Sequence, residues 1–228
     1  MSTATSWSIT TELCEMSGEP SLLSACRRLG LVGNMALSAD IEEIRPWFHS
    51  GSETYSYVFR VHGEHSFDGA LILKAMVAAT PGVPPEVQLR KRLSRRSRLA
   101  QFGCSVPVLF GVGAGVYLEA HAGSDLIALI EAAPLADELQ ASLAAMVSCV
   151  ADAGFSPISI IPNIVVSDST VNWVDFGSDL GDPLMAQATS NLATMLLREY
   201  SSRSSFPLGP GSPILLGAFV PSPGSPAS

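Results

Sequence analysis

The sequence of 228 residues has few charged side chains and only two lysines, Lys74 and Lys91. Charged residues make up 15% of the chain and hydrophobic residues 47%, a composition typical of a folded globular protein rather than of a disordered tail. The net charge of -8 lacks the excess of Lys and Arg that general nucleic-acid binding requires. We therefore expect a globular protein that does not bind nucleic acid.

Paired cysteine motifs, targeting sequences and long apolar runs are also missing. The four cysteines (Cys14, Cys26, Cys104 and Cys149) have neither CxxC nor Cys/His spacing, so we expect reduced, mostly buried thiols rather than a zinc site or a disulfide framework. The first residues, MSTATSWSITTE, lack the basic and then apolar regions of a signal peptide. No apolar run approaches the ~20 residues that cross a bilayer. These absences predict a cytoplasmic protein without a membrane partner.

The order of the predicted elements indicates an α+β fold. Three β-rich runs (EEIRPWFHSG, YSYVFRVHG and GALILKAMV) predict a meander of strands. PPEVQLRKRLSRRSRLAQFG predicts a helix that begins at Pro84 and Pro85 and ends before Gly103. VPVLFGVG and GVYLEAHAG predict two further strands. A long helical region interrupted at Pro134, a hairpin formed by NIVVSDS and TVNWVDFG, and a last helix complete the pattern.

These elements divide the chain into four expected parts. They are a helical extension (residues 1–40), a β-rich part with one helix (41–120), a mainly helical part with the hairpin (121–206) and a Pro/Gly/Ser-rich tail (207–228). In the tail we expect only the apolar segment ILLGAFV to pack firmly. Strands followed by helices are typical of α+β proteins, and a cleft between two lobes is the natural place for a ligand.

Four residues attract attention as candidates for chemistry, although each has a plain structural alternative. Lys74 ends an apolar strand, where an unpaired charge is costly; it is either a required compact ammonium or a lysine that snorkels to solvent. Glu86 lies in the first turn of the predicted helix, where the helix dipole alone favours a carboxylate. Asn163 precedes one strand of the hairpin and Asp175 follows the other, and both residue types are common in turns.

Taken together, Lys74 in ALILK, Glu86, Asn163 in PNIVV and Asp175 in WVDFG resemble the protein-kinase-like family, which includes the aminoglycoside and choline phosphotransferases. The resemblance covers roughly residues 41–200. It implies a two-lobed fold with a β-rich N-lobe and a short helical C-lobe. The compactness resembles minimal kinases among bacterial effectors, and kinase-like enzymes that phosphorylate peptides in natural-product pathways.

The resemblance implies ATP and Mg²⁺ as cofactors. Lys74 would neutralise the phosphates with Glu86 as its partner, while Asn163 and Asp175 would hold the metal. The other implied nucleotide contacts are Gly51 and Ser52 in a glycine-rich loop that lacks the full GxGxxG, Glu119 to His121 at a hinge whose backbone meets adenine, and Asp125 at a ribose or substrate contact.

One residue that the family uses is missing from this sequence. By the family spacing the catalytic-loop aspartate falls at Ile158, in GFSPISIIPN, and an isoleucine cannot act as a base. A kinase with a relocated base stays open: Asp152 would require a rearranged loop, and Asp179 and Asp182, just after the DFG segment, could reach the cleft. Three functions therefore stay open: a kinase that phosphorylates Ser/Thr hydroxyls of a peptide or protein, a pseudokinase that binds nucleotide or a partner enzyme without catalysis, and an α+β interaction module with accidental motif matches.

Six of the 13 basic residues fall in the segment RKRLSRRSR, residues 90–98. One interpretation is a solvated helix face. The other is a docking surface in which Arg90, Arg92, Arg95 and Arg96 bind an acidic or phosphorylated partner, since Arg recognises carboxylate and phosphate groups well. Because Glu86 lies on the same predicted helix, docking there would also position Glu86.

Overall fold

The structure is a computed structural model. It describes residues 41–50, 53–62, 69–76, 83–113, 115–167, 170–181 and 192–219. The predictions for residues 1–40, for Gly51 and Ser52, for Asp182 and for the end of the tail lie outside these ranges. The chain forms two compact units, and each is described by itself.

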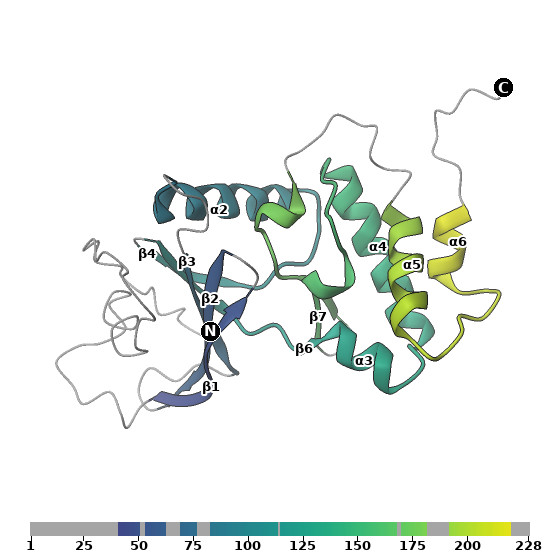
Figure 1. The fold of residues 1–228 in the computed structure, drawn as a ribbon, viewed down its shortest axis with the longest axis horizontal. Coiled ribbons are helices and arrows are strands. Elements are labelled where there is room, and N and C mark those ends of the chain that lie inside the picture. The colour runs from purple at the N-terminus through teal and green to yellow at the C-terminus, as the bar shows by residue number, and fades with distance from the viewer. Residues whose placement is uncertain are drawn as a thin grey trace, which may run out of the picture. The chain divides into compact units, whose positions relative to one another are not determined.

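The first unit (Met1–Arg92 and Pro107–His121) is built on a five-stranded antiparallel sheet. Its strands are β1 (Ile41–Ser50), β2 (Thr54–Val61), β3 (Leu71–Met76), β4 (Leu109–Gly113) and β5 (Val116–Ala120), in the spatial order β1-β2-β3-β5-β4. All five strands are confirmed predictions. Helix α2 (Pro85–Gln101) lies between β3 and β4 in the sequence, as predicted, and the boundary between the units falls within it (Figure 1).

The two faces of this sheet differ in chemistry. One face is apolar, with Phe59, Leu73 and Leu118 completely buried. The alternate positions include Ser56, Lys74 and Tyr117, which the strand register aligns in one row across β2, β3 and β5. Cross-strand partners share a face. The only charged residue of β3, Lys74, therefore lies beside the polar side chains of Ser56 and Tyr117.

The second unit (Leu93–Val106 and Ala122–Ser228) is mainly helical. Its helices are α3 (Leu126–Ala132), α4 (Asp137–Asp152), α5 (Leu192–Arg203) and α6 (Pro213–Phe219), with short 3-10 turns η3 (Ile161–Asn163) and η4 (Ser178–Leu180). The predicted break near Pro134 is confirmed, because it separates α3 from α4. No helix within the described ranges is long and apolar enough to cross a membrane. With its sheet-rich and helical parts, the chain is an α+β protein, as predicted.

A small sheet completes the second unit. It consists of β6 (Ser124–Asp125), β7 (Ile164–Ser167) and β8 (Thr170–Trp173), and the β7–β8 hairpin is a confirmed prediction. Strand β6 has only two residues, too few for a recognisable sequence pattern. Gly123 lets β6 approach β7: its φ is +111°, and a Cβ there would lie 2.1 Å from the Val166 carbonyl oxygen.

Helix α4 packs against α5 and α6 (Figure 1), and it also contacts β8. The large side chains Phe155, Trp173 and Phe176 are each at most 1% exposed in the core of the second unit. The apolar segment of the tail forms α6 and buries Ile214. The prediction that this segment packs firmly is therefore confirmed only for Ile214, because Leu216 is 57% exposed.

A disulfide joins Cys104, which follows α2, to Cys149 on α4, with the two Cα atoms 5.6 Å apart. The expectation of reduced thiols was therefore wrong for this pair. The two cysteines are separated by 45 residues, and only the tertiary fold brings their Cα atoms within bridging distance. The spacing of cysteines in the sequence carries no such information.

Candidate functional site

Lys74 lies in a buried ion pair within the first unit. Its Nζ is 2.8 Å from Oε1 of Glu119 on β5, and the two side chains are only 6% and 1% exposed. Lys74 on β3 is directly opposite Tyr117 on β5, and Glu119 follows Tyr117 by two residues. The Lys74 and Glu119 side chains are therefore diagonal neighbours on one face of the sheet. The Tyr117 ring centroid lies 5.8 Å from the same ammonium nitrogen. The ammonium is thus compensated from a neighbouring strand rather than by snorkelling to solvent.

The carboxylate that pairs with Lys74 is not the predicted one. The sequence predicts Glu86 as the partner, but the structure pairs Lys74 with Glu119, while Glu86 lies partly exposed in the first turn of α2. Glu119 had been assigned to the hinge through its backbone. The two-residue period of β5 places Glu119 on the same face as Tyr117, but only the β3–β5 pairing shows that this face also holds Lys74.

This polar row leaves hydrogen-bonding capacity unused. Ser56 Oγ and Glu119 Oε2 are buried and have no hydrogen-bond partner among the residues that the structure describes. A buried polar atom without a partner costs about 1–3 kcal/mol, more when charged, and often marks a place where a water, ion or ligand binds. The row around Lys74 is therefore a candidate binding position and not simply a satisfied core.

The predicted hinge residues have different surroundings. Glu119 and His121 belong to the first unit, in which the backbone N–H of His121 donates to the carbonyl oxygen of Ala70 at 2.9 Å. That N–H is used within the protein, so a contact of this hinge with adenine would use another backbone group, and the hinge role stays a prediction. Asp125 belongs to the second unit, where it is exposed and pairs with Val165 of β7.

The basic segment of α2 is only partly a solvated face. Arg92 is 3% exposed, and its Nη2 donates to Oε2 of Glu53 at 3.0 Å. A buried, paired guanidinium cannot serve as an exposed docking group, so that prediction was wrong for Arg92. Arg90 and Lys91 are exposed, in keeping with either interpretation of the segment.

The part of the basic segment that belongs to the second unit also makes internal contacts. Arg95 Nη1 donates to the backbone carbonyl oxygens of Phe176 and Gly177, at 3.4 and 2.7 Å, and Arg96 is half-buried. Arg95 therefore supports the backbone after Asp175, a role that the sequence did not reveal. Binding of an acidic or phosphorylated partner by Arg90 and Arg96 stays a prediction. The internal hydrogen bonds of Arg95 make it a weaker candidate for such binding.

Asn163 and Asp175 lie at the same end of the β7–β8 hairpin. Ile164 pairs with Trp173, and the N–H of Val174 donates to the carbonyl oxygen of Asn163 at 3.0 Å, which extends the ladder by one step. Asn163 is 5% exposed. Asp175 is partly exposed, and its Oδ1 accepts from the backbone N–H of Gly177 at 2.8 Å. The hairpin thus brings an amide and a carboxylate to one place.

The loop before Asn163 contains the position at which the family has its aspartate. Ile158 stands there with its side chain 75% exposed, and its backbone N–H donates to the carbonyl oxygen of Asp179 at 2.8 Å. Further along the loop, Asn163 Nδ2 donates to the carbonyl oxygen of Ser159 at 3.0 Å. The loop is therefore held by a backbone hydrogen bond at Ile158 and by a side-chain hydrogen bond from Asn163.

Glu199 on α5 is a residue of this region that the sequence did not indicate. Its carboxylate accepts hydrogen bonds from the backbone N–H of Ile160, at 3.0 and 3.1 Å to its two oxygens, and of Ile161, at 2.8 Å. Nothing in the segment REYSS distinguishes this glutamate from a surface charge, because its partners lie 38 and 39 residues earlier in the chain. Glu199 holds the loop between Ile158 and Asn163.

Replacing Glu199 with alanine is expected to lower the free energy of unfolding by about 2–3 kcal/mol, because two amides lose a charged acceptor. Chemical denaturation would measure the loss, and native-state hydrogen exchange would localise it to Ile160 and Ile161. Exposed Glu138, in the first turn of α4, provides a matched control as Glu138→Ala. If both amides stayed as protected as in the wild type, the role of Glu199 would be disproved.

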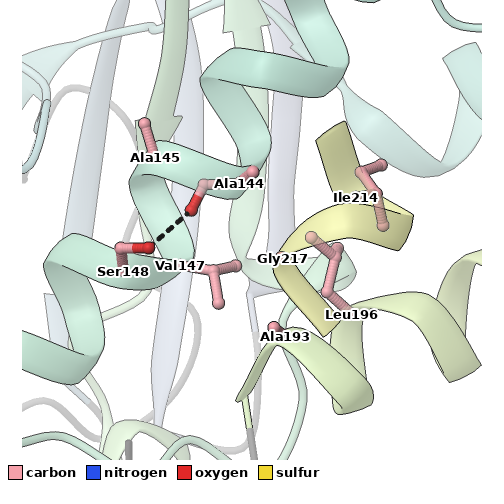
Figure 2. A pocket seen from close by; sticks show the side chains of 8 residues that line it. All are labelled: Ala144, Ala145, Val147, Ser148, Ala193, Leu196, Ile214 and Gly217. Atoms are coloured by element: carbon pink, nitrogen blue, oxygen red, sulfur yellow. Dashed lines mark hydrogen bonds between the residues drawn. The ribbon is translucent and has the colours of Figure 1, made fainter. Parts of the chain in front are cut away.

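A cavity of about 200 Å³ lies elsewhere in the second unit, among α4, α5 and α6 (Figure 2). Its lining is Ala144, Ala145, Val147, Ser148, Ala193, Leu196, Ile214 and Gly217. The only side-chain hydroxyl among these residues, that of Ser148, donates to the carbonyl oxygen of Ala144 at 3.1 Å. The lining includes no predicted site residue and no charge that could bind a phosphate.

Comparison with known proteins adds no family assignment. No protein-family model matches the sequence, and no curated protein matches it either. The resemblance to the kinase-like family therefore stays a prediction from the sequence.

Proposed function

We propose that the chain is an ATP- and Mg²⁺-dependent phosphotransferase of two-lobed kinase-like fold that phosphorylates a Ser/Thr hydroxyl of a peptide or protein. The observation that carries the proposal is the position of Asn163 and Asp175 at one end of the β7–β8 hairpin. Two hard oxygen donors at one place suit Mg²⁺, which takes few protein ligands and completes its shell with phosphate oxygens and water.

Features of the first unit support the same proposal. The resemblance requires a lysine on the third strand of an antiparallel sheet and a helix between the third and fourth strands, and β3 and α2 meet this requirement. The Lys74 ammonium is already held by Glu119, and a position-fixed cation is what a triphosphate needs for charge compensation. Here Glu119 takes the holding role that the resemblance gave to Glu86.

Each group has a limited task in this proposal. Bound Mg²⁺ would neutralise charge that develops on the transferred phosphoryl group. Asp175 and Asn163 would hold the ion, Lys74 would orient the phosphates, and Glu119 would keep the ammonium in place. Positioning and electrostatic stabilisation account for most of the acceleration in phosphoryl transfer, so the lack of an aspartate at position 158 would slow the proposed reaction without abolishing it.

The alternative proposal is a pseudokinase, and Ile158 is the observation that favours it. Ile158 occupies the position of the base, is 75% exposed and has an apolar side chain, so it offers no proton acceptor. General-base assistance contributes roughly 10²–10⁴-fold to rates. In this alternative, the chain would bind nucleotide or a partner enzyme without catalysis.

Replacing Asp175 with alanine should weaken ATP binding at least about tenfold in the presence of Mg²⁺ and should have little effect without the ion, because Asp175 acts through the metal. Calorimetry on the full chain would measure both affinities, alongside transfer of radiolabelled phosphate to a Ser/Thr-rich peptide mixture. Asp152→Ala, at the exposed end of α4, is the control.

The possible results separate the proposals. Mg²⁺-dependent binding with transfer, both reduced only in Asp175→Ala, supports the kinase. Mg²⁺-dependent binding without detectable transfer or hydrolysis supports the pseudokinase. Absence of ATP binding in the wild-type protein contradicts the kinase and a nucleotide-binding pseudokinase, and it leaves a module that binds only a partner.

A further inference from the structure

The turn η4 lies against the loop in which the family's aspartate is missing. The N–H of Ile158 donates to the carbonyl oxygen of Asp179 at 2.8 Å. Gly181, which ends the turn with φ +76°, packs so closely that a Cβ there would lie 3.3 Å from the carbonyl oxygen of Ser156. An aspartate is thus held next to the position at which the sequence has an isoleucine.

Two contacts within the second unit fix the turn in this place. Leu180 is 1% exposed and belongs to the core, and Arg95 binds the carbonyl oxygens of Phe176 and Gly177 just before the turn. The Asp179 side chain itself is partly exposed and forms no hydrogen bond or ion pair with the described part of the chain. Within the part of the chain that the structure describes, it is a carboxylate on a fixed backbone to which no side-chain contact assigns a structural task.

The same set of contacts links Asp179 to the proposed metal ligands. Val174 binds Asn163 through its N–H, Asn163 binds Ser159 through its side chain, and Ile158 binds Asp179 through its N–H. The backbone from Asp175 through Gly177 leads directly into η4, so Asp179 is also connected to Asp175 along the chain. Asp175, Asn163 and Asp179 therefore surround one loop within a single unit, and their arrangement does not depend on the other unit.

We propose that Asp179 supplies the general base that Ile158 cannot, a proposal that rests on the function proposed above. The hydroxyl proton of the acceptor passes to the Asp179 carboxylate while the hydroxyl oxygen forms a bond to the γ-phosphorus of ATP. The bond from that phosphorus to the bridging oxygen breaks, and its electron pair leaves with ADP. The phosphorylated acceptor, ADP and a protonated Asp179 result, and the proton then returns to solvent.

Other carboxylates fit this role less well. Asp175 has one oxygen bound to the Gly177 N–H and is needed for the metal. Asp152 is exposed at the end of α4, and the described contacts do not connect it to Ile158. The exposed Ile158 side chain would then contribute an apolar contact for the acceptor rather than chemistry.

The test is Mg²⁺-dependent ATP hydrolysis by the full chain, in which water replaces the unidentified acceptor and needs the same base. Asp179→Asn should lower kcat about 10²–10⁴-fold, and Asp179→Glu should recover part of the rate. ATP affinity by calorimetry should stay within about twofold of wild type. The exchange protection of the Ile158 amide should also be unchanged, because its acceptor is the Asp179 backbone. Asp152→Asn serves as the control.

Each result decides a different point. A large loss of kcat with intact ATP binding and intact Ile158 protection supports Asp179 as the base. A rate within about threefold of wild type in Asp179→Asn overturns this role and leaves the proposed kinase standing. A wild-type rate no higher than that of Asp175→Ala overturns the role as well. In that case, calorimetry shows whether the nucleotide-binding proposal also fails.

Discussion

Replacing Lys74 with alanine is expected to lower the free energy of unfolding by about 3–5 kcal/mol. The variant leaves the Glu119 carboxylate 1% exposed with no compensating charge, next to an Oε2 atom that already has no partner in the described structure. Losing one member of a buried ion pair costs more than losing both, because the remaining charge stays desolvated. Urea unfolding of the full chain measures the loss, with an unchanged m-value as the check that the two-state transition is retained.

A matched double variant separates this effect from a simple loss of packing. Lys74→Met combined with Glu119→Leu removes both charges and keeps similar volume, so its stability should return to within about 1–2 kcal/mol of wild type. The double variant also keeps the fold for the functional assays while lacking the ammonium, so its ATP affinity reports the role of Lys74 free of instability. If Lys74→Ala and the double variant were equally stable, the ion pair would not be buried in solution.

The Lys74 pair also shows how far local sequence patterns reach. An apolar, β-rich run identified β3 and placed Lys74 near its end, and Pro134 marked the break between α3 and α4. These features depend on neighbours within a few residues. The choice of Glu119 over Glu86 depends on β3 pairing with β5 instead of with the next strand in the sequence, β4. No local pattern encodes that order.

The same limit explains the basic segment and the loop before Asn163. A run such as RKRLSRRSR indicates charge, and only the three-dimensional surroundings show that Arg92 pairs with Glu53 and that Arg95 binds Gly177. The contact between Ile158 and Asp179 is likewise a backbone contact, which any residue types could form. Sequence patterns could therefore identify the candidate residues Asn163 and Asp175, but not the groups that support them.

Reduction of the Cys104–Cys149 disulfide is expected to lower the free energy of unfolding by about 4 kcal/mol. The two cysteines are 45 residues apart. In the chain-entropy model, a cross-link over a loop of this length lowers the conformational entropy of the unfolded chain, which stabilises the folded state by about 4 kcal/mol. The native packing should survive reduction. Cys149 Sγ lies 3.3 Å from the carbonyl oxygen of Phe102, which can accept a hydrogen bond from the free thiol.

The measurement compares the unfolding of one protein in its oxidised and reduced states, so that every side chain is the same and only the cross-link differs. Cys14→Ser with Cys26→Ser should keep the full response to dithiothreitol, whereas Cys104→Ala with Cys149→Ala should lose it. Alkylation and mass spectrometry of the native, oxidised protein should find Cys104 and Cys149 unmodified. Alkylation of both would rule out the disulfide.

The disulfide also bears on where the protein works. Disulfides persist mainly in oxidising surroundings and are usually catalytic or redox-sensing when they occur in the cytosol. Cys104 is 5% exposed, and Cys149 is half-buried, a position that suits a structural cross-link better than a transient one. A disulfide that resists millimolar glutathione would argue against the cytoplasmic location that we predict from the sequence, and one that is readily reduced would agree with it.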